Sequence, residues 1–236
     1  IFDHADSLNI PVAAHIVELW DAISAVREGA SLVGHSVRDQ PVTEELIDVM
    51  KENNVCITPT LTRELSTYIY RERPDFFDDP FFTKEVDPLV IEQLQLSRVQ
   101  EYYRSEEADY FRDALPLATE NMMALHSAGV KIAMGTDSGP PARFQGYFEH
   151  LEMEMMQGAG MTPEEVLLSA TRIAAECTFV DSELGTLEDG KWADFVVLNE
   201  NPLSDVRNLR TVESVYVGGN PVNLNSPYQT SGDQKE

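Results

Sequence analysis

The sequence predicts a parallel α/β fold, in which short buried strands alternate with amphipathic helices. Short apolar runs rich in β-branched residues predict strands at 11–15, 30–34, 55–61 and 130–135. A helix at 17–28 and another that begins after Thr43 separate the first three strands and leave short connections. This alternation of strand and helix is typical of parallel sheets.

Each predicted helix has an apolar stripe and a recognisable end. The stripe within 17–28 is followed by Gly29, the residue type that most often ends helices. Thr43 precedes two glutamates, as expected of a residue that caps a helix N-terminus. Residues 1–9 carry a shorter stripe, which predicts one or two helical turns.

Residues 62–115 differ from the rest of the chain because they combine many aromatic residues with three prolines. We expect a loop folded over the mouth of a barrel, at the carboxyl ends of the strands. Helices at about 89–112 and 116–128 should follow, and then the fourth strand. One interpretation of 62–128 is an active-site lid, since long insertions in compact domains are often functional. The alternative is a helical hairpin packed on the outside of the domain.

The last third of the chain changes from helices to short strands. A helix is predicted at 146–158, where the acidic run 149–154 is interpreted as a solvated face, and Thr162 begins a second helix with a capping box. Strands at 193–198, 212–217 and 222–224 then form a small β annex. The predicted division is therefore a main domain over 1–179, an annex over 180–224 and a disordered tail over 225–236.

Composition excludes several classes of function. A net charge of −24 repels nucleic acid and anionic membranes, and no apolar run approaches the ~20 residues of a membrane helix. The chain begins without an initiator Met or a signal peptide, so we expect the natural N-terminus to be missing. The compartment stays open between cytoplasmic and periplasmic or secreted. The two cysteines, Cys56 and Cys177, are interpreted as buried thiols.

Three predicted strands end in residues that bind metals. His15 ends the first strand, His35 follows the second, and Asp137 follows the fourth, where Gly139, Pro140 and Pro141 stop the strand. Carboxyl ends of parallel strands carry the chemistry of α/β barrels, and imidazole with carboxylate suits Zn²⁺ and similar ions. Taken singly, each histidine is more often structural, and Asp137 alone could cap its own turn.

A second group of residues is assigned to substrate binding. Arg143 lies in the loop after Asp137, where it could grip a substrate carboxylate, the alternative being an ion pair with Glu149 or Glu152. Tyr147 is assigned to the pocket wall or to packing, and Arg63 to the pocket because it follows the third strand. The remaining histidines of the later chain are interpreted as surface or capping residues, namely His126 and His150.

Taken in order, the strand-end motifs and the annex are similar to the second half of an enzyme of the amidohydrolase superfamily. The motifs are Ala14-His15, Gly34-His35, Pro59-Thr60, residues 135–137, residues 185–198 with Gly-Lys-x-Ala-Asp before a Val-rich strand, and residues 217–222. The groups that the chain resembles most are the imidazolonepropionase-like and Xaa-Pro-dipeptidase-like hydrolases. The resemblance covers almost the whole chain, with 62–115 the least typical part.

The resemblance implies a TIM (β/α)8 barrel, of which this chain holds strands 5–8, with part of a small β-sandwich. It implies that His15 and His35 bind a divalent metal, first of all zinc, as one or two ions. Asp137 is implied to be both a ligand and the proton acceptor for the attacking water. The His-x-His pair and the lysine that the family places in the first half-barrel are absent from this sequence, and His4 cannot replace them.

The function predicted for the intact protein is hydrolysis of C–N bonds in small amides, cyclic amides or peptides by metal-activated water. Arg143 favours a substrate that bears a carboxylate. One alternative is a non-catalytic fragment or scaffold, because half of the expected ligands are missing. Another is association between chains, since open sheet edges favour pairing, so that a homo-oligomer supplies the missing half.

Overall fold

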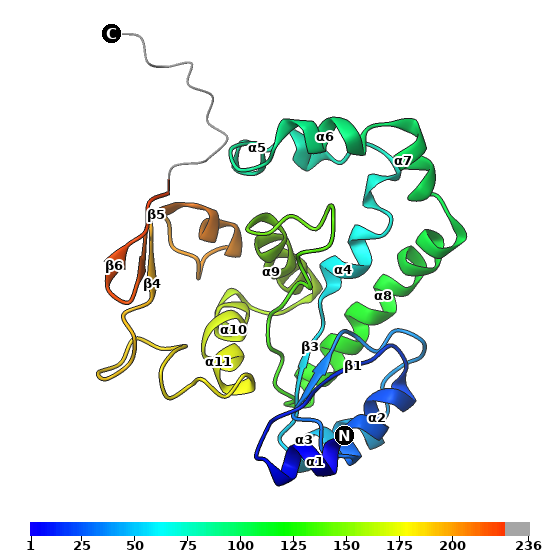
Figure 1. Cartoon of the computed structure of the whole chain (residues 1–236), viewed down its shortest axis with the longest axis vertical. Helices are drawn as coiled ribbons and strands as arrows, with labels where there is room; N and C mark the ends of the chain where they lie inside the picture. The colour runs from blue at the N-terminus through cyan, green and yellow to red at the C-terminus, as the bar shows by residue number, and fades with distance from the viewer. Residues whose placement is uncertain (225–236) are drawn as a thin grey trace.

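Three parallel strands form one sheet, in the lower part of the view beside α2 and α3 (Figure 1). The computed structural model describes residues 1–224, and in it β1 (Ala13–His15), β2 (Leu32–Gly34) and β3 (Cys56–Thr58) pair in that order. The predicted strand at 130–135 is reduced to one parallel bridge between Ile57 and Ile132. Within residues 1–224 the sheet stays open and does not close into a barrel.

The helices that connect these strands begin and end where the sequence predicts. α2 (Leu19–Arg27) is followed by Gly29, whose positive φ of 104° permits the turn, and α3 (Glu44–Glu52) is capped by the Thr43 hydroxyl. A short helix, α1 (Phe2–Ser7), precedes β1. The apolar faces of α2 and α3 join the strands and α8 in the main core, which includes Ile23, Val33, Leu46, Ile57 and Leu125.

The insertion after β3 is more helical than predicted. β3 ends at Thr58, and the chain turns into α4 (Leu61–Ser66), two 3-10 turns (Ile69–Arg71 and Asp75–Asp78), α5 (Pro80–Thr83), α6 (Pro88–Leu94) and α7 (Ser97–Tyr102). These elements form an arch that leads into α8 (Glu106–Ser127) (Figure 1). The aromatic residues of the arch form a second core with Tyr147 and Phe148.

The predicted helix break before Pro116 is wrong, because α8 runs unbroken through this residue. An internal proline costs about 3 kcal/mol, since it removes one hydrogen bond and crowds the preceding turn. Burial of Ala118, Met122 and Leu125 on the main core offsets that cost. The true start of α8 lies at Ser105, whose hydroxyl accepts a hydrogen bond from the Ala108 amide.

The final third of the described chain contains a helical run and the annex. α9 (Tyr147–Ala159) is followed by α10 (Pro163–Leu168), whose capping box at Thr162 is as predicted, a π-helical segment (Ser169–Ile173) and α11 (Ala174–Cys177). In the annex, β4 (Phe195–Leu198), β5 (Val212–Val217) and β6 (Asn220–Pro221) pair antiparallel, with the 3-10 helix η4 (Val206–Arg210) between the first two. The tail predicted at 225–236 lies outside the described residues.

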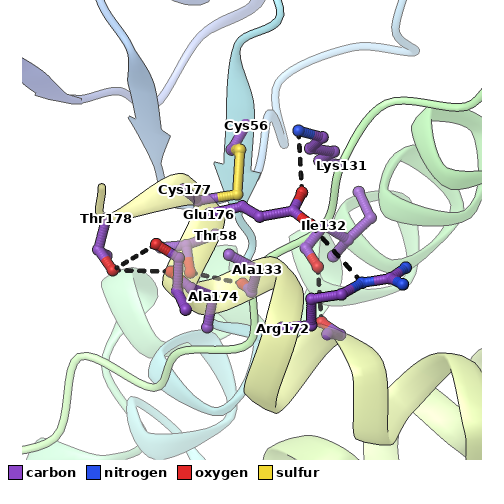
Figure 2. Close-up of a disulfide and its surroundings, with 12 residues drawn as sticks. Cys56, Thr58, Lys131, Ile132, Ala133, Arg172, Ala174, Glu176, Cys177 and Thr178 are labelled. Carbon is purple, nitrogen blue, oxygen red and sulfur yellow. Dashed lines mark hydrogen bonds and ion pairs between the residues drawn. A yellow bond between two sulfur atoms is a disulfide. The ribbon is translucent and has the colours of Figure 1, made fainter. Parts of the chain in front are cut away.

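The prediction of two buried thiols is wrong, because Cys56 and Cys177 form a disulfide (Figure 2). Both residues are buried, as expected, at 3% and 2% exposure. The bond joins β3 to α11 through two cysteines that are 121 residues apart in the sequence and meet only in the folded chain. The Lys131 ammonium, beside this bond, pairs with Glu176 at 3.0 Å.

As far as the described helices extend, each is too short or too polar to cross a bilayer.

Candidate active site

The carboxyl ends of the parallel strands carry the polar residues predicted for the site. His15 ends β1, His35 directly follows β2, and Thr60 lies just beyond β3. Asp137 follows the bridge at Ile132. His35, Thr60 and Asp137 have left-handed backbones with φ of 76°, 54° and 55°. Such backbone is uncommon outside glycine and tends to cluster at functional sites.

The structure brings His15 and His35 into contact. Their ring centroids lie 4.4 Å apart in an edge-to-face arrangement, because β1 and β2 are neighbours with His15 opposite Gly34. Burial, followed by the charge of His15, lowers the pKa of His35 to about 4, against an opposing effect of Asp137. His35 is therefore a neutral imidazole at neutral pH, the form that binds metals.

Thr60 holds the His35 ring in place. The Thr60 hydroxyl oxygen lies 2.6 Å from Nδ1 of His35, and both residues are buried. An Nδ1–H that donates to this hydroxyl leaves the Nε2 lone pair of His35 for an ion. Thr60 was part of the Pro59-Thr60 motif in the sequence, but its role as the partner of His35 was not predicted.

Asp137 is paired with Arg143 instead of being free. Nη1 of Arg143 lies 2.5 Å from Oδ2 of Asp137 and donates to the Asp137 carbonyl oxygen at 3.2 Å, while Nε donates to the Ser66 hydroxyl at 3.1 Å. The alternative interpretation of Arg143, a surface ion pair with Glu149 or Glu152, is therefore wrong. Arg143 instead orients the carboxylate that was predicted to be catalytic.

The loop that carries Asp137 is anchored to α9 through Glu149. The Thr136 hydroxyl lies 2.8 Å from Oε1 of Glu149 and 2.7 Å from the Ser138 hydroxyl, and Oε2 of Glu149 accepts from the Gly146 amide at 2.6 Å. Glu149 thus ties both ends of the loop together. The acidic run was expected to be a solvated helix face, and this contact already departs from that expectation.

Glu152 departs further, because it is fully buried. Its carboxylate accepts hydrogen bonds at 2.7 Å from the Leu61 amide, the Thr62 amide and the Thr62 hydroxyl, all at the start of α4. Burial raises the pKa of Glu152 to about 7, against the opposing effect of these bonds. Glu152 therefore fixes α4 directly after Thr60, and the prediction of a solvated face is wrong here.

A buried ion-pair network lies beside His35. Arg38 and Glu64 are almost fully buried, and Nη1 of Arg38 lies 3.0 Å from Oε1 of Glu64. Arg63 pairs with the other oxygen of Glu64 at 2.6 Å and stacks its guanidinium over the Phe111 ring. Both arginines lower the pKa of His35. Nothing in the sequence pattern had singled out Arg38 or Glu64, and the pocket role of Arg63 stays a prediction.

The contacts found for the other predicted residues are with groups other than the paired histidines. Tyr147 is buried in the aromatic core, stacked on Phe76 with centroids 4.9 Å apart. His126 faces Glu165 at 3.2 Å, in line with a surface role. His150 was expected at the surface and is instead packed against Phe81, with its Nδ1 buried. Burial, with a smaller effect of Arg210, lowers the pKa of His150 to about 4.

His15, His35 and Asp137 are of the residue types that bind divalent ions, but only the two histidines are placed so that they could bind one together. Two imidazoles in contact can share one ion, since Zn–N bonds are about 2.0–2.1 Å long. In residues 1–224, however, no three side chains of His, Cys, Asp or Glu are grouped so that they could hold an ion. His15 and His35 are thus brought together as predicted, whereas the carboxylate of Asp137 is held by Arg143.

Comparison with known families decides where the chain belongs. The model of the amidohydrolase family matches residues 1–222. The chain belongs to the amidohydrolase family. The resemblance inferred from the strand-end motifs is therefore confirmed for nearly the whole chain.

Curated members of the family match this amidohydrolase over shorter stretches. It is 37% identical to ochratoxinase from Aspergillus niger over 97 residues, which are 39% of this chain and 19% of the relative. It is 38% identical to imidazolonepropionase from Agrobacterium fabrum over 105 residues, which are 43% of this chain and 22% of the relative.

Solved structures match this amidohydrolase over almost its whole length. A putative prolidase from Bifidobacterium longum has a TM-score of 0.72 and 25% identity, and the match covers 98% of this chain and 51% of that one. A Xaa-Pro dipeptidase has a TM-score of 0.69 and 22% identity, covering 94% of this chain and 47% of that one. The chain spans about half the length of these structures.

Proposed function

We propose that this chain forms one side of the active site of a metal-dependent hydrolase that cleaves C–N bonds in small amides or peptides. The observation that carries the proposal is the contact of His15 with His35 at the ends of adjacent parallel strands. Asp137 follows the bridge at Ile132, and its carboxylate acts to raise the pKa of His35. The family match and the hydrolase names of the curated relatives support the same reaction class.

The residues of this chain have distinct roles in the proposal. His15 and His35 would hold a divalent ion, first of all Zn²⁺, and Thr60 keeps His35 oriented toward it. When bound, such an ion lowers the pKa of a bound water to about 7. Asp137 would complete the ligand set and accept the proton of the attacking water. Arg143 positions the Asp137 carboxylate.

We assign the substrate to small amides or peptides that bear a carboxylate. Two solved relatives support this class, a Xaa-Pro dipeptidase with bound methionine and a prolidase in complex with N-methylphosphonate-L-proline. Arg143 forms an ion pair with Asp137 and is the first candidate to bind that carboxylate, and we keep Arg63 and Tyr147 as further substrate-binding candidates. The insertion 62–128, which comprises the arch and α8, would act as the lid of this site.

The test of the proposal is hydrolysis by the natural protein loaded with Zn²⁺ or Mn²⁺. Asp137→Asn is expected to lower kcat at least 100-fold, because loss of a general base typically costs 10²–10⁴-fold. Glu164→Gln changes an exposed carboxylate of α10 and is the matched control, expected to keep wild-type kcat. Unchanged kcat in Asp137→Asn would disprove the assignment.

A second candidate is a non-catalytic fragment or scaffold. It is supported by the lack of a three-ligand group within the described part of the chain. Calorimetric titration with Zn²⁺ separates the two candidates. Stoichiometric binding that disappears in His15→Ala would rule out the inert scaffold, whereas the absence of heat would favour it.

We also propose that the open sheet is completed by further polypeptide, either as the other half of a barrel or as a second copy of the chain. In residues 1–224, β1 pairs with β2 alone, so one of its edges is available. Light scattering that shows a monodisperse monomer would count against the second copy.

The disulfide supports an oxidising compartment, periplasmic or secreted, over the cytoplasm. Disulfides persist where the environment is oxidising and are rare in reducing compartments. Alkylation of the protein from its native source, under denaturing conditions and without reductant, should modify neither Cys56 nor Cys177. Two modified cysteines would place the protein in a reducing compartment.

A further inference from the structure

A cavity of about 310 Å³ lies beside the loop that carries Asp137 and Arg143. Its walls come from three parts of the chain that are distant in sequence, namely the end of α4, the turn between α7 and α8, and the loop after Asp137. The wall residues used below are Ser66, Tyr102, Tyr103, Pro140, Pro141 and Arg143. The volume is at the small end of ligand sites and suits a group of the size of one amino acid.

Arg143 supplies this cavity with an oriented guanidinium, whose charge is balanced in part by the ion pair with Asp137. Its Nη1 is bound to Asp137 and its Nε to Ser66, so the guanidinium plane is held on two sides. Among the described residues, none accepts a hydrogen bond from Nη2, and the side chain is 14% exposed. A guanidinium that is oriented, largely desolvated and has an N–H donor without an acceptor is well suited to bind a carboxylate.

The remaining walls are flat and largely apolar. Tyr102 is 67% exposed, an unusual position for a large aromatic ring, and meets Tyr103 edge to face at 5.3 Å. Pro140 and Pro141 add rings without amide donors. Glu107 also lines the cavity, but it is solvent-exposed and its charge is therefore screened more strongly than that of Arg143.

We propose that this cavity binds the α-carboxylate and the aromatic or ring-shaped side chain of the substrate. Arg143 would bind the carboxylate through Nη2, and the two tyrosines and two prolines would enclose the side chain. Because Arg143 also holds Asp137, the bound carboxylate would sit at a fixed distance from the group acting on the scissile bond. The catalytic part of this inference rests on the proposed function, whereas the binding part stands without turnover.

Calorimetry on the metal-free protein tests the binding part, with N-acetyl-L-phenylalanine and N-acetyl-L-phenylalaninamide as probes. These probes differ only in the carboxylate. The wild type is expected to bind the acid at least tenfold more tightly than the amide, since hydrogen bonds to charged groups contribute about 1.5–3 kcal/mol. Arg143→Gln should abolish this preference.

Tyr102→Ala provides an independent variant that leaves Arg143 and the Asp137 loop untouched. It should weaken both probes about fivefold and keep the acid-to-amide ratio, because it removes only apolar contact. Tyr110→Ala is the matched control, an exposed tyrosine of α8 outside the cavity, and should bind as the wild type does.

Three results would overturn the proposal: no binding of either probe, equal binding of acid and amide by the wild type, or wild-type affinities in Tyr102→Ala. These results are distinct from failure of the proposed function, which would show as unchanged hydrolysis in Asp137→Asn whatever the probes do.

Discussion

An uncommon backbone conformation is shared by three residues of the candidate site. His35, Thr60 and Asp137 all have positive φ where the chain leaves the sheet. A left-handed conformation costs a non-glycine residue about 1–3 kcal/mol, which the surrounding packing must offset. Asn tolerates this backbone well, so Asp137→Asn removes the carboxylate with little added strain.

At the scale of one residue, His150 should make the protein sensitive to acid. Its pKa is about 4 in the folded chain against 6.5 for the free side chain, because it is buried against Phe81 and near Arg210. As the pH falls, His150 is therefore protonated at a higher pH in the unfolded chain than in the folded chain. The stability from the neutral ring is complete above pH 6.5 and is lost as the pH falls through 4, by at most about 3 kcal/mol.

Urea unfolding of the wild type and His150→Phe at pH 7.0 and pH 4.5 measures this effect. The wild type should lose more stability between the two pH values than His150→Phe does. Parallel losses in the two proteins would show that other groups cause the acid sensitivity.

At the scale of an element, α4 depends on one side chain from α9. Glu152 accepts bonds from two amides and a hydroxyl at the start of α4, in a site closed to water. Glu152→Ala leaves these donors without partners, which should lower the free energy of unfolding by about 2–4 kcal/mol. Urea denaturation measures the loss, and Glu164→Ala, at an exposed position of α10, should change stability by less than about 0.5 kcal/mol.

A Glu152→Ala protein as stable as Glu164→Ala would mean that water enters and satisfies the amides of Leu61 and Thr62. In that case Glu152 would not be required to fix α4 beside Thr60.

At the scale of the whole molecule, the disulfide closes a loop across most of the domain. It joins β3 to α11 over 121 residues, and removing a bond of this span typically costs about 2–5 kcal/mol. The double variant Cys56→Ser, Cys177→Ser should therefore unfold at lower urea. Wild-type protein unfolded with dithiothreitol present should match the variant, and identical midpoints with and without reductant would argue that the bond is not formed.

The annex is joined to the rest of the molecule through Arg210. This residue of η4 binds Asp79 of the arch and Glu154 of α9, each at 2.5 Å, and lies over the Tyr147 ring. Arg210→Met should lower the free energy of unfolding by about 1–3 kcal/mol, since it leaves two partly buried carboxylates unpaired.

The same 3-10 helix offers a matched control. Arg207→Met removes an arginine whose ion pair with Asp205 is exposed, so unfolding by urea should change little. Equal effects of the two variants would mean that the contacts of Arg210 are no more important than a surface pair.

The sequence by itself determined which residues stand at the strand ends and which family the chain resembles. Apolar periodicity and capping residues are local, so Gly29, Thr43 and Thr162 could be interpreted from their neighbours alone. The placement of His15, His35 and Asp137 followed from where apolar runs stop. The family match over residues 1–222 confirms that resemblance.

Only the tertiary structure decided which side chains meet. Three contacts each depend on how separate elements pack: the disulfide, the burial of Glu152 against α4, and the ion pair of Arg143 with Asp137. Glu149, Glu152 and Glu154 look alike in the sequence, yet they hold a loop, a helix start and an arginine. Contacts between distant residues leave no periodic pattern along the chain, and for that physical reason local sequence could not predict them.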